Sequence, residues 1–366
     1  MLKSSLTERQ LIERFVDALR ELPEIEANLH HQGGISEHGA RMSGIQVDLR
    51  VAGKSFILQI EARREVFPRD VRQVIWQFRE ASRTWNNKNG DGEAPLALLI
   101  AESISPGAKD LLKSECVGYY DSGGSLFLPA PGAYLYIDRP PPKTLEKSVR
   151  ALFSSRRAQV LHAILVRHQE WFGVNDLAQQ AMVSPATASQ VLTELERFDW
   201  LASRGQGPSK ERHLREPAAL LDAWTKQLAG TRPPPMRRYY VPGMKADSLV
   251  DQIGDVFGRH EVQYAVTAEV AAQHYAPFLS NVSQVRARVL SGPNTDAAIS
   301  DLGARVVNDG ANFAVIEAKS SGELLYREKI GGLWFASPIH IYLDLLRGEG
   351  RAKEMAEHFR KERIGF

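Results

Sequence analysis

Four polar residues in the first third of the chain have side-chain types that could take part in hydrolytic chemistry with a metal ion. Asp48 lies in one run of alternating apolar and polar residues, and Glu61 and Arg63 lie near the end of the next run. Two carboxylates on neighbouring strands offer the oxygen ligands that Mg²⁺ prefers, and Mg²⁺ can polarise a phosphate for attack by water. Gln77 belongs to the helical pattern that follows these runs.

Arg63 follows Glu61 by two positions and cannot serve as the base in such chemistry. Arginine stays protonated, so it can stabilise negative charge but cannot generate hydroxide. We therefore expect Asp48, Glu61, Arg63 and Gln77 to form a degenerate site without cleavage. Asp48 and Glu61 would bind Mg²⁺ only if the site were active, and no other cofactor is expected. The alternative is that both carboxylates form ion pairs with Arg63 or Arg64.

A second set of residues, in the middle of the chain, suits contacts with base pairs. Ala188, Val191, Leu192 and Leu195 recur at helical spacing and predict a helix with one apolar face. The opposite face has short side chains without carboxylates, so it can lie deep in a major groove and present hydrogen-bonding groups to base edges. The candidate DNA-binding residues of this helix are Ser184, Ala186, Thr187, Ser189, Gln190 and Thr193.

Basic residues follow this helix in a segment that predicts a strand hairpin. Residues 200–204 and 212–214 have the pattern of two short strands around the turn at 205–208. Cations in such a hairpin can contact phosphates or a minor groove. The candidates are Arg204, Lys210, Arg212 and Arg215.

Two helices and a turn must position these side chains. Asp176 to Met182 predicts a short helix, Ser184 can cap the next one, and Pro185 fits its first position. The segment LAQQAMVSPATASQVLTELERFDWL resembles the bacterial winged helix-turn-helix regulators, because Leu-Ala, Val-Ser, Thr, Leu, Leu-Glu and the closing Leu have the spacing of that superfamily. The resemblance implies DNA binding. The alternative is a helical subdomain or a winged helix that contacts protein.

The composition of the chain predicts a folded protein of several domains. It has 366 residues and a formal net charge of +2, so any electrostatic attraction to nucleic acid must be local. Its one cysteine, Cys116, excludes an intramolecular disulfide framework and a cysteine-rich zinc site. The N-terminus lacks an apolar signal core and no run is long enough to span a bilayer, so we expect a cytoplasmic protein without a membrane partner.

Two proline clusters, at residues 140–142 and 233–235, divide the sequence. Such runs interrupt helices and central strands. The resulting prediction is an α/β multidomain chain with an α/β domain at 1–140, a winged helix-turn-helix domain at 143–232 and a second α/β domain at 236–366.

The first of these domains resembles the restriction-endonuclease-like PD-(D/E)XK fold. It has a helical pattern from Thr7 to Leu19, alternating runs at 45–51 and 55–61, a helical pattern at 68–82 and an apolar run at 94–101. Asp48 and the triplet Glu61-Ala62-Arg63 stand where that family has its acidic residue and its E-x-K triplet. The arginine replaces the family's lysine, so the resemblance implies the fold more than the cleavage.

The last domain resembles the C-terminal part of AbiEi-type antitoxins of type IV toxin-antitoxin systems. Residues 337–363 contain a Y-x-D-L helix, a Gly-Arg turn and an E-x-A-E-x-x-R helix, and residues 264–272 fit the strand and helix that begin that family's nucleotidyltransferase-like domain. Transfer chemistry would need a Gly-Ser loop and two acids on the next strand. This chain has Thr267-Ala268 and then Arg286 and Arg288, so we expect no transfer activity.

The leading hypothesis is a sequence-specific, DNA-binding transcriptional regulator of the antitoxin-like kind. Its expected partners are double-stranded DNA and a cognate toxin protein. Two alternatives stay open: a Mg²⁺-dependent DNA nuclease directed by its own winged helix, and an adaptor that binds only protein. The apolar face of Leu220, Leu221, Trp224 and Leu228 fits either a homodimer or packing within the domain.

Overall fold

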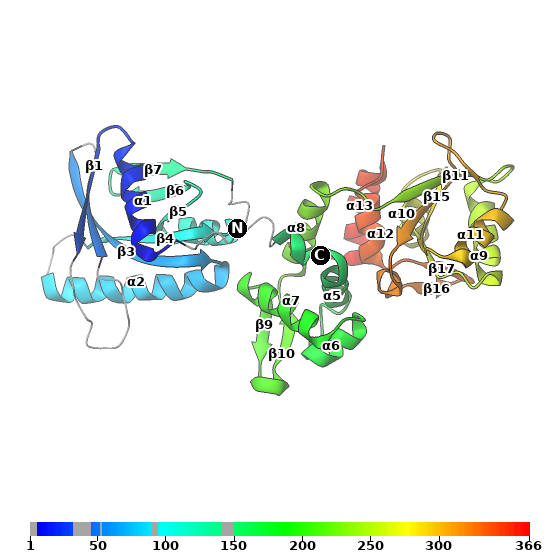
Figure 1. Cartoon of the computed structure of the whole chain (residues 1–366), viewed down its shortest axis with the longest axis horizontal. Helices are drawn as coiled ribbons and strands as arrows, with labels where there is room; N and C mark the ends of the chain where they lie inside the picture. Colours follow the sequence, from blue (N-terminus) through cyan, green and yellow to red (C-terminus); the bar gives the residue numbers. More distant parts are fainter. Residues whose placement is uncertain (1–5, 32–44, 52, 90–93, 141–148) are drawn as a thin grey trace. The chain divides into compact units, whose positions relative to one another are not determined.

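The computed structural model describes residues 6–31, 45–51, 53–89, 94–140 and 149–366 (Figure 1). The chain is a multidomain protein of mixed α/β structure. Its first compact unit comprises residues 1–151 together with 193–199, and the second comprises 152–192 and 200–366. The boundary expected between residues 140 and 143 lies partly outside the described residues.

The first unit contains a seven-stranded sheet whose strand order follows the sequence. Strands β3, β4 and β5 are parallel and the other neighbours are antiparallel. Parallel neighbours need a crossover, which α2 (Pro68–Asn89) and α3 (Pro106–Ser114) supply. The strands are β1 (Ile25–His31), β2 (Ile45–Val51), β3 (Lys54–Val66), β4 (Leu96–Ile104), β5 (Gly118–Asp121), β6 (Leu126–Ala130) and β7 (Ala133–Ile137).

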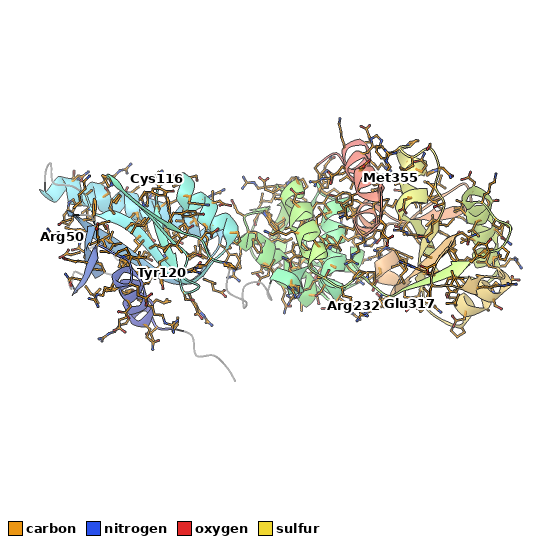
Figure 2. The ribbon with its side chains drawn as sticks, turned by 90° about the horizontal axis from the view of Figure 1, so that it is seen from above. Arg50, Cys116, Tyr120, Arg232, Glu317 and Met355 are labelled. Atoms are coloured by element: carbon orange, nitrogen blue, oxygen red, sulfur yellow. The ribbon has the colours of Figure 1, made fainter. Side chains whose placement is uncertain are left out.

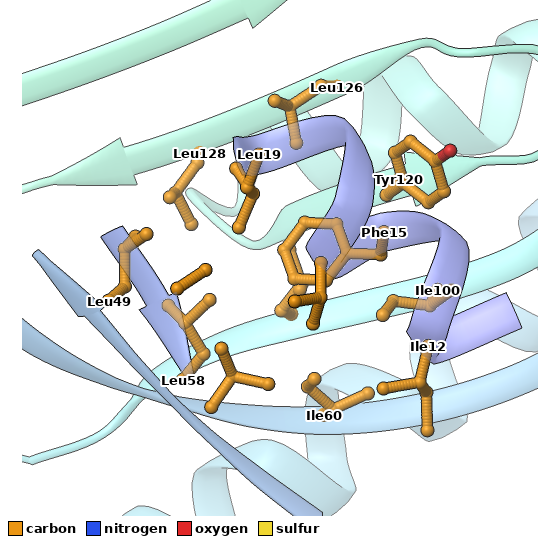
Figure 3. Packing of buried hydrophobic residues seen from close by; sticks show 14 of the residues in the cluster. Ile12, Phe15, Leu19, Leu49, Leu58, Ile60, Ile100, Tyr120, Leu126 and Leu128 are labelled. Atoms are coloured by element: carbon orange, nitrogen blue, oxygen red, sulfur yellow. The ribbon is translucent and has the colours of Figure 1, made fainter. Parts of the chain in front are cut away.

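Apolar side chains cover both faces of this sheet. Helix α1 (Glu8–Arg20) begins at a capping box formed by Thr7 and Gln10, as the sequence predicts. Its Phe15 and Leu19 pack on one face of the sheet, against strand residues that include Leu58 (Figure 3). On the other face, α2 and α3 pack against β4, β5 and β6. A sheet buried on two faces explains why β4 is almost wholly apolar.

The expected elements of this unit are confirmed, and three of them, β3, α2 and β4, end later than predicted. The helix after Thr7 and the run at 45–51 have their predicted positions. Strand β3 continues to Val66 and helix α2 to Asn89, beyond the predicted ends. Cys116 is exposed and lies in the turn after α3 (Figure 2).

The next elements are those that the sequence predicts to form a helix-turn-helix and a wing. They are α5 (Ser155–Val166), β8 (Trp171–Phe172), α6 (Val174–Gln180), α7 (Pro185–Arg197), β9 (Leu201–Arg204), the short η1 (Gly207–Ser209), β10 (Glu211–Leu214) and α8 (Pro217–Ala229). They lie in the second unit except for the end of α7, because residues 193–199 belong to the first unit. Strand β10 pairs with both β8 and β9 in a three-stranded antiparallel sheet. The predicted hairpin therefore gains a third strand that the sequence analysis did not identify.

A second seven-stranded sheet follows, with the order β14-β11-β15-β13-β12-β17-β16. Its strands are β11 (Met236–Tyr240), β12 (Tyr264–Thr267), β13 (Val285–Leu290), β14 (Arg305–Val306), β15 (Phe313–Ala318), β16 (Glu328–Ile330) and β17 (Leu333–Phe335). Its helices are α9 (Ala246–Arg259), α10 (Ala268–Tyr275), α11 (Pro293–Asp301), α12 (Pro338–Leu345) and α13 (Ala352–Phe359), with short turns at Ser321–Leu324 and Arg360–Ile364.

Polar contacts join α5 and α8 to later parts of the chain within this second unit. Gln159 of α5 donates a hydrogen bond from Nε2 to Ser320 Oγ at 3.1 Å. Arg360 forms an ion pair with Asp222 of α8 at 2.6 Å. Met355 of α13, labelled in Figure 2, is fully buried. Helix α5 therefore packs against α6 and also against α12 and the short turn at Ser321–Leu324.

Candidate nucleic-acid interface

Helix α7 starts at a side-chain cap that the sequence predicts. The backbone N–H of Thr187 donates to Ser184 Oγ at 3.2 Å, and the two hydroxyl oxygens lie 3.0 Å apart. Pro185 occupies the first helical position, where its missing N–H costs nothing. The turn before the cap passes through Met182 with φ +52, a left-handed conformation that reverses the chain between α6 and α7.

One face of α7 is buried and the opposite face is exposed without a carboxylate. Ala188, Val191, Leu192 and Leu195 are fully buried, as predicted. Ala186, Gln190 and Thr193 are exposed and follow one another at helical spacing, so they form a single stripe. Thr187 and Ser189 are only half-buried beside this stripe. Glu194 and Glu196 come after the stripe, toward the end of the helix.

Gln190 has a partner that the sequence analysis did not identify. Arg157, in the first turn of α5, donates from Nη2 to Gln190 Oε1 at 3.3 Å. The two residues lie 33 positions apart, and Arg157 is half-buried where Gln190 is exposed. Periodicity carries no information about such a contact, because it depends on how α5 packs beside α7.

The wing consists of β9, β10 and the turn between them. Arg204 pairs with Glu211 and Leu201 with Leu214 across the hairpin. Gly205 has φ +72, and a Cβ there would lie 2.8 Å from the backbone oxygen of Ser209. The turn therefore requires glycine at this position, both for its backbone conformation and for space.

The basic residues of the wing divide into two kinds, and one prediction needs correction. Arg212 is only 8% exposed, and its Nη1 donates to the backbone oxygen of Lys210 at 3.3 Å. A buried guanidinium cannot reach a phosphate on the outside, so Arg212 is a structural residue of the hairpin. Arg215 is exposed and Lys210 is half-buried.

Arg204 is exposed but already has two partners. Its Nε lies 2.7 Å from Glu211 Oε2, and its guanidinium lies 4.3 Å from the centroid of the Trp171 ring on β8. Glu211 compensates part of the positive charge that the sequence analysis assigned to the wing. Contacts with an aromatic ring and a carboxylate restrict the guanidinium to one place beside the turn.

The four candidate residues of the nuclease-like site do not lie at the same position along the strands of the first sheet. Asp48 on β2 pairs with Ile57 on β3, whereas Glu61 lies four residues farther along β3. Alternation puts Asp48 and Glu61 on the same side of the sheet, as expected, but a strand rises about 3.3 Å per residue, so about 13 Å separates their levels. Within the described ranges, no group of three His, Cys, Asp or Glu side chains is placed to hold a metal ion.

Arg63 joins Glu61 and Gln77 into a local cluster instead. Its Nη2 lies 3.0 Å from Glu61 Oε1 and donates to Gln77 Oε1 of α2 at 3.2 Å. Burial raises the pKa of Glu61, and the nearby charge of Arg63 opposes that rise. The ion pair that the sequence analysis gave as the alternative for Glu61 is therefore present.

The arginines of the last domain also have structural partners. Arg288 on β13 forms two hydrogen bonds with the Asp344 carboxylate, at 2.7 and 2.6 Å, and Thr267 Oγ1 donates to the same group at 2.7 Å. Arg286 forms an ion pair with Glu269 of α10 at 3.2 Å. The two positions where transfer chemistry would need acids thus hold cations that neutralise carboxylates of neighbouring helices.

No family model matches the chain, and no curated protein matches it. Among solved structures, the crystal structure of NolR from Sinorhizobium fredii is similar over 25% of this chain and 95% of that chain, with 17% sequence identity and a TM-score of 0.18. A similarity with so low a TM-score supports no conclusion about the fold or function of this chain. In the described ranges, no helix is both long and apolar enough to cross a membrane.

Proposed function

We propose that this chain is a sequence-specific, DNA-binding transcriptional regulator of the antitoxin-like kind, and that α7 enters the major groove of double-stranded DNA. The observation that carries the proposal is the exposed stripe of Ala186, Gln190 and Thr193, which has no carboxylate. Short side chains let the helix approach the base edges closely, and the absence of acids avoids repulsion from the phosphates on either side.

The cap and the wing support the same proposal. The Ser184 cap satisfies a backbone donor at the start of α7 and fixes the helix end that would approach the DNA. Arg204, Lys210 and Arg215 lie on the hairpin that follows, where they would contact phosphates or a minor groove. Ser189 and Thr187 complete the proposed contact set at the edges of the stripe.

The outer parts of the chain are assigned by resemblance. Residues 1–140 form an inactive PD-(D/E)XK-like domain, and residues 236–366 form an inactive, nucleotidyltransferase-like domain of the AbiEi kind that binds a cognate toxin. Residues 143–232 form the DNA-binding domain of a cytoplasmic protein. The apolar face of α8 packs within its own unit, where Leu220, Leu221 and Trp224 are buried. A homodimer would therefore have to form through another surface.

The test is an electrophoretic mobility shift with double-stranded DNA selected from a randomised pool. We expect wild-type protein to shift the selected DNA and to shift a scrambled sequence of the same composition much less. Ala186→Glu with Gln190→Glu places two carboxylates on the exposed stripe, so it should abolish the shift by repelling the phosphates.

The matched control is Asn294→Glu with Ala297→Glu, which adds the same charge to exposed positions of α11. This variant should bind like the wild type. Loss of binding in both variants would show a general charge effect, and unchanged binding in both would reject α7 as the contact. Equal shifts of selected and scrambled DNA by the wild type would reject sequence specificity.

A further inference from the structure

The contact between Arg157 and Gln190 limits which groups Gln190 can offer to DNA. Arg157 Nη2 donates to the amide oxygen of Gln190 at 3.3 Å. A guanidinium has only donors, so the amide atom that faces it must be the oxygen and the amide nitrogen must point away. The nitrogen of Gln190 therefore presents its two N–H groups at the exposed surface of α7.

Arg157 adds further hydrogen-bond donors beside those of Gln190, and its positive charge is not compensated by an ion pair among the described residues. Among the described residues, no carboxylate forms an ion pair with Arg157, and Gln190 takes only one of its N–H groups. The remaining N–H groups of Arg157 and the amide N–H groups of Gln190 are all donors. Ala186 and Thr193, the neighbours of Gln190 on the stripe, are too short to cover them.

We propose that the Arg157–Gln190 pair makes this helix select guanine at one position of its DNA site. The proposal rests on the function proposed above. In the major groove, guanine presents two acceptors, N7 and O6, whereas adenine presents one acceptor and one donor. Glutamine pairs with adenine by using both its oxygen and its nitrogen. Because Arg157 turns the amide oxygen of Gln190 toward α5, the amide nitrogen is the group that faces outward, and an acceptor edge fits its N–H groups best.

In this arrangement Gln190 contacts the base and Arg157 is a positioning residue. Cytosine offers a donor, which the outward N–H groups of the pair cannot accept, and thymine offers one acceptor beside a methyl group. Guanine alone presents acceptors at both positions, so it matches a surface made only of donors. Without Arg157, the amide of Gln190 could rotate and use its oxygen, and adenine would become the better partner.

The test compares base preference among variants of the full-length chain. Wild type, Arg157→Ala, Arg157→Lys and Gln190→Ala are each used to select sequences from a randomised double-stranded DNA pool, and relative affinities are measured for the four bases at each position. We expect guanine at one position for the wild type, by about tenfold over adenine, a ratio within the range of a good side-chain to base contact.

The variants separate a positioning role from other roles of Arg157. In Arg157→Ala the preference at that position should change from guanine to adenine. Arg157→Lys keeps a donor beside the amide oxygen and should keep guanine, whereas Gln190→Ala should lose the preference there. Thermal melting of each variant identifies a loss of folding, and the salt dependence of binding identifies a lost phosphate contact.

The possible outcomes distinguish this inference from the function on which it rests. Arg157→Ala protein that melts like the wild type and keeps guanine would overturn the inference, and so would a wild type that selects adenine. A uniform loss of affinity with a lower salt dependence would assign Arg157 to a phosphate and would also overturn it. If no variant and no wild type enriched any sequence, the proposed DNA-binding function would itself be rejected.

Discussion

Arg212 and Leu214 point to the same side of β10, because side chains alternate along a strand. Leu214 is buried, so the residue two positions before it must also face inward. The alternation of burial along β10 shows this directly, with Arg212 and Leu214 buried and Glu211 and His213 partly exposed. The charge of Arg212 is therefore part of the hairpin's interior, and under the proposed function the phosphate contacts fall to the other cations of the wing.

The first prediction concerns Arg212. We expect Arg212→Ala to lower the free energy of unfolding by about 1–3 kcal/mol, because it removes a buried donor and leaves the Lys210 backbone oxygen without that bond. The salt dependence of DNA binding should not change, since no phosphate contact is lost. Chemical unfolding and salt titration of binding provide the two measurements.

The second prediction concerns Lys210 and Arg215, which we assign to phosphates. Lys210→Ala with Arg215→Ala should reduce the slope of log affinity against log salt by about 0.9 for each contact removed. Lys353→Ala with Lys361→Ala removes two exposed cations from the end of the chain and serves as the control. A slope that changes with Arg212→Ala but not with the Lys210 and Arg215 variant would reverse the assignment.

At the scale of the elements, sequence periodicity predicted where helices and strands lie in the chain better than it predicted which elements pack or pair with one another. The cap at Ser184, the apolar spacing of α7 and the apolar run of β4 are local signals, and the structure has elements at these places. The amphipathic α9 and the two-residue β8 were not identified from the sequence. A strand as short as β8 has too few residues for alternation to be visible, and it exists because β10 offers it a partner.

The hairpin of β2 and β3 shows what register adds to pattern. The tight turn pairs Val51 with Lys54, and this pairing fixes every other pair of the hairpin. Asp48 must then lie opposite Ile57, four residues from Glu61. The side of the sheet could be predicted from alternation, but the level of each carboxylate depends on the turn. Counting residues outward from the turn would have separated the two carboxylates.

The third prediction follows from this register. We expect the purified chain to leave supercoiled plasmid intact in Mg²⁺ and in Mn²⁺. Arg63→Lys should also fail to cut, although it supplies the lysine that the nuclease family uses, because Asp48 on β2 lies opposite Ile57, too far from Glu61 on β3 for the two carboxylates to share one ion. Asp48→Ala and Glu61→Ala proteins should still bind the selected DNA.

Plasmid cutting by the wild type or by Arg63→Lys would be informative only with a matched control. Asp48→Asn combined with Arg63→Lys distinguishes the chain's own activity from a contaminating nuclease. Cutting that depends on Asp48 would contradict the prediction and would favour the alternative of a Mg²⁺-dependent nuclease directed by its winged helix.

At the scale of the whole molecule, the nearly balanced charge makes binding depend on local features. A net charge of +2 over 366 residues provides little general attraction to DNA, so the DNA binding that we propose would depend on the surface of α7 and the wing. Within the second unit, a buried histidine pair joins α5 to α12. The ring centroids of His162 and His340 lie 4.0 Å apart, and His162 Nε2 contacts Ser337 Oγ.

The surroundings of this pair favour neutral imidazoles. Burial and the nearby Arg288 lower the pKa of His162 to about 3, and burial, His162 and Arg288 lower the pKa of His340 as well. Tyr326 packs edge-on against the His162 ring, with 5.2 Å between centroids. The Asp344 carboxylate is held by Arg288, so it is not available to compensate a second positive charge.

The fourth prediction is that acid destabilises the chain through these histidines. The pKa of His162 in the folded chain, about 3, is below the value of about 6.5 expected after unfolding. Above pH 6.5 this histidine does not change the free energy of unfolding. As the pH falls from 6.5 toward 3, the free energy of unfolding decreases, because the unfolded chain binds a proton that the folded chain does not. In this range His162 should lower the free energy of unfolding by up to about 1.4 kcal/mol per pH unit, and the lowered pKa of His340 acts in the same direction. Urea unfolding at pH 7.5, 6 and 5 measures how the free energy of unfolding changes with pH, and His162→Gln should make this slope shallower.

The control is Ile164→Val, a buried change on the same helix without a titrating group, which should lower stability equally at every pH. A His162→Gln slope as steep as that of the wild type would show that this pair does not set the acid sensitivity.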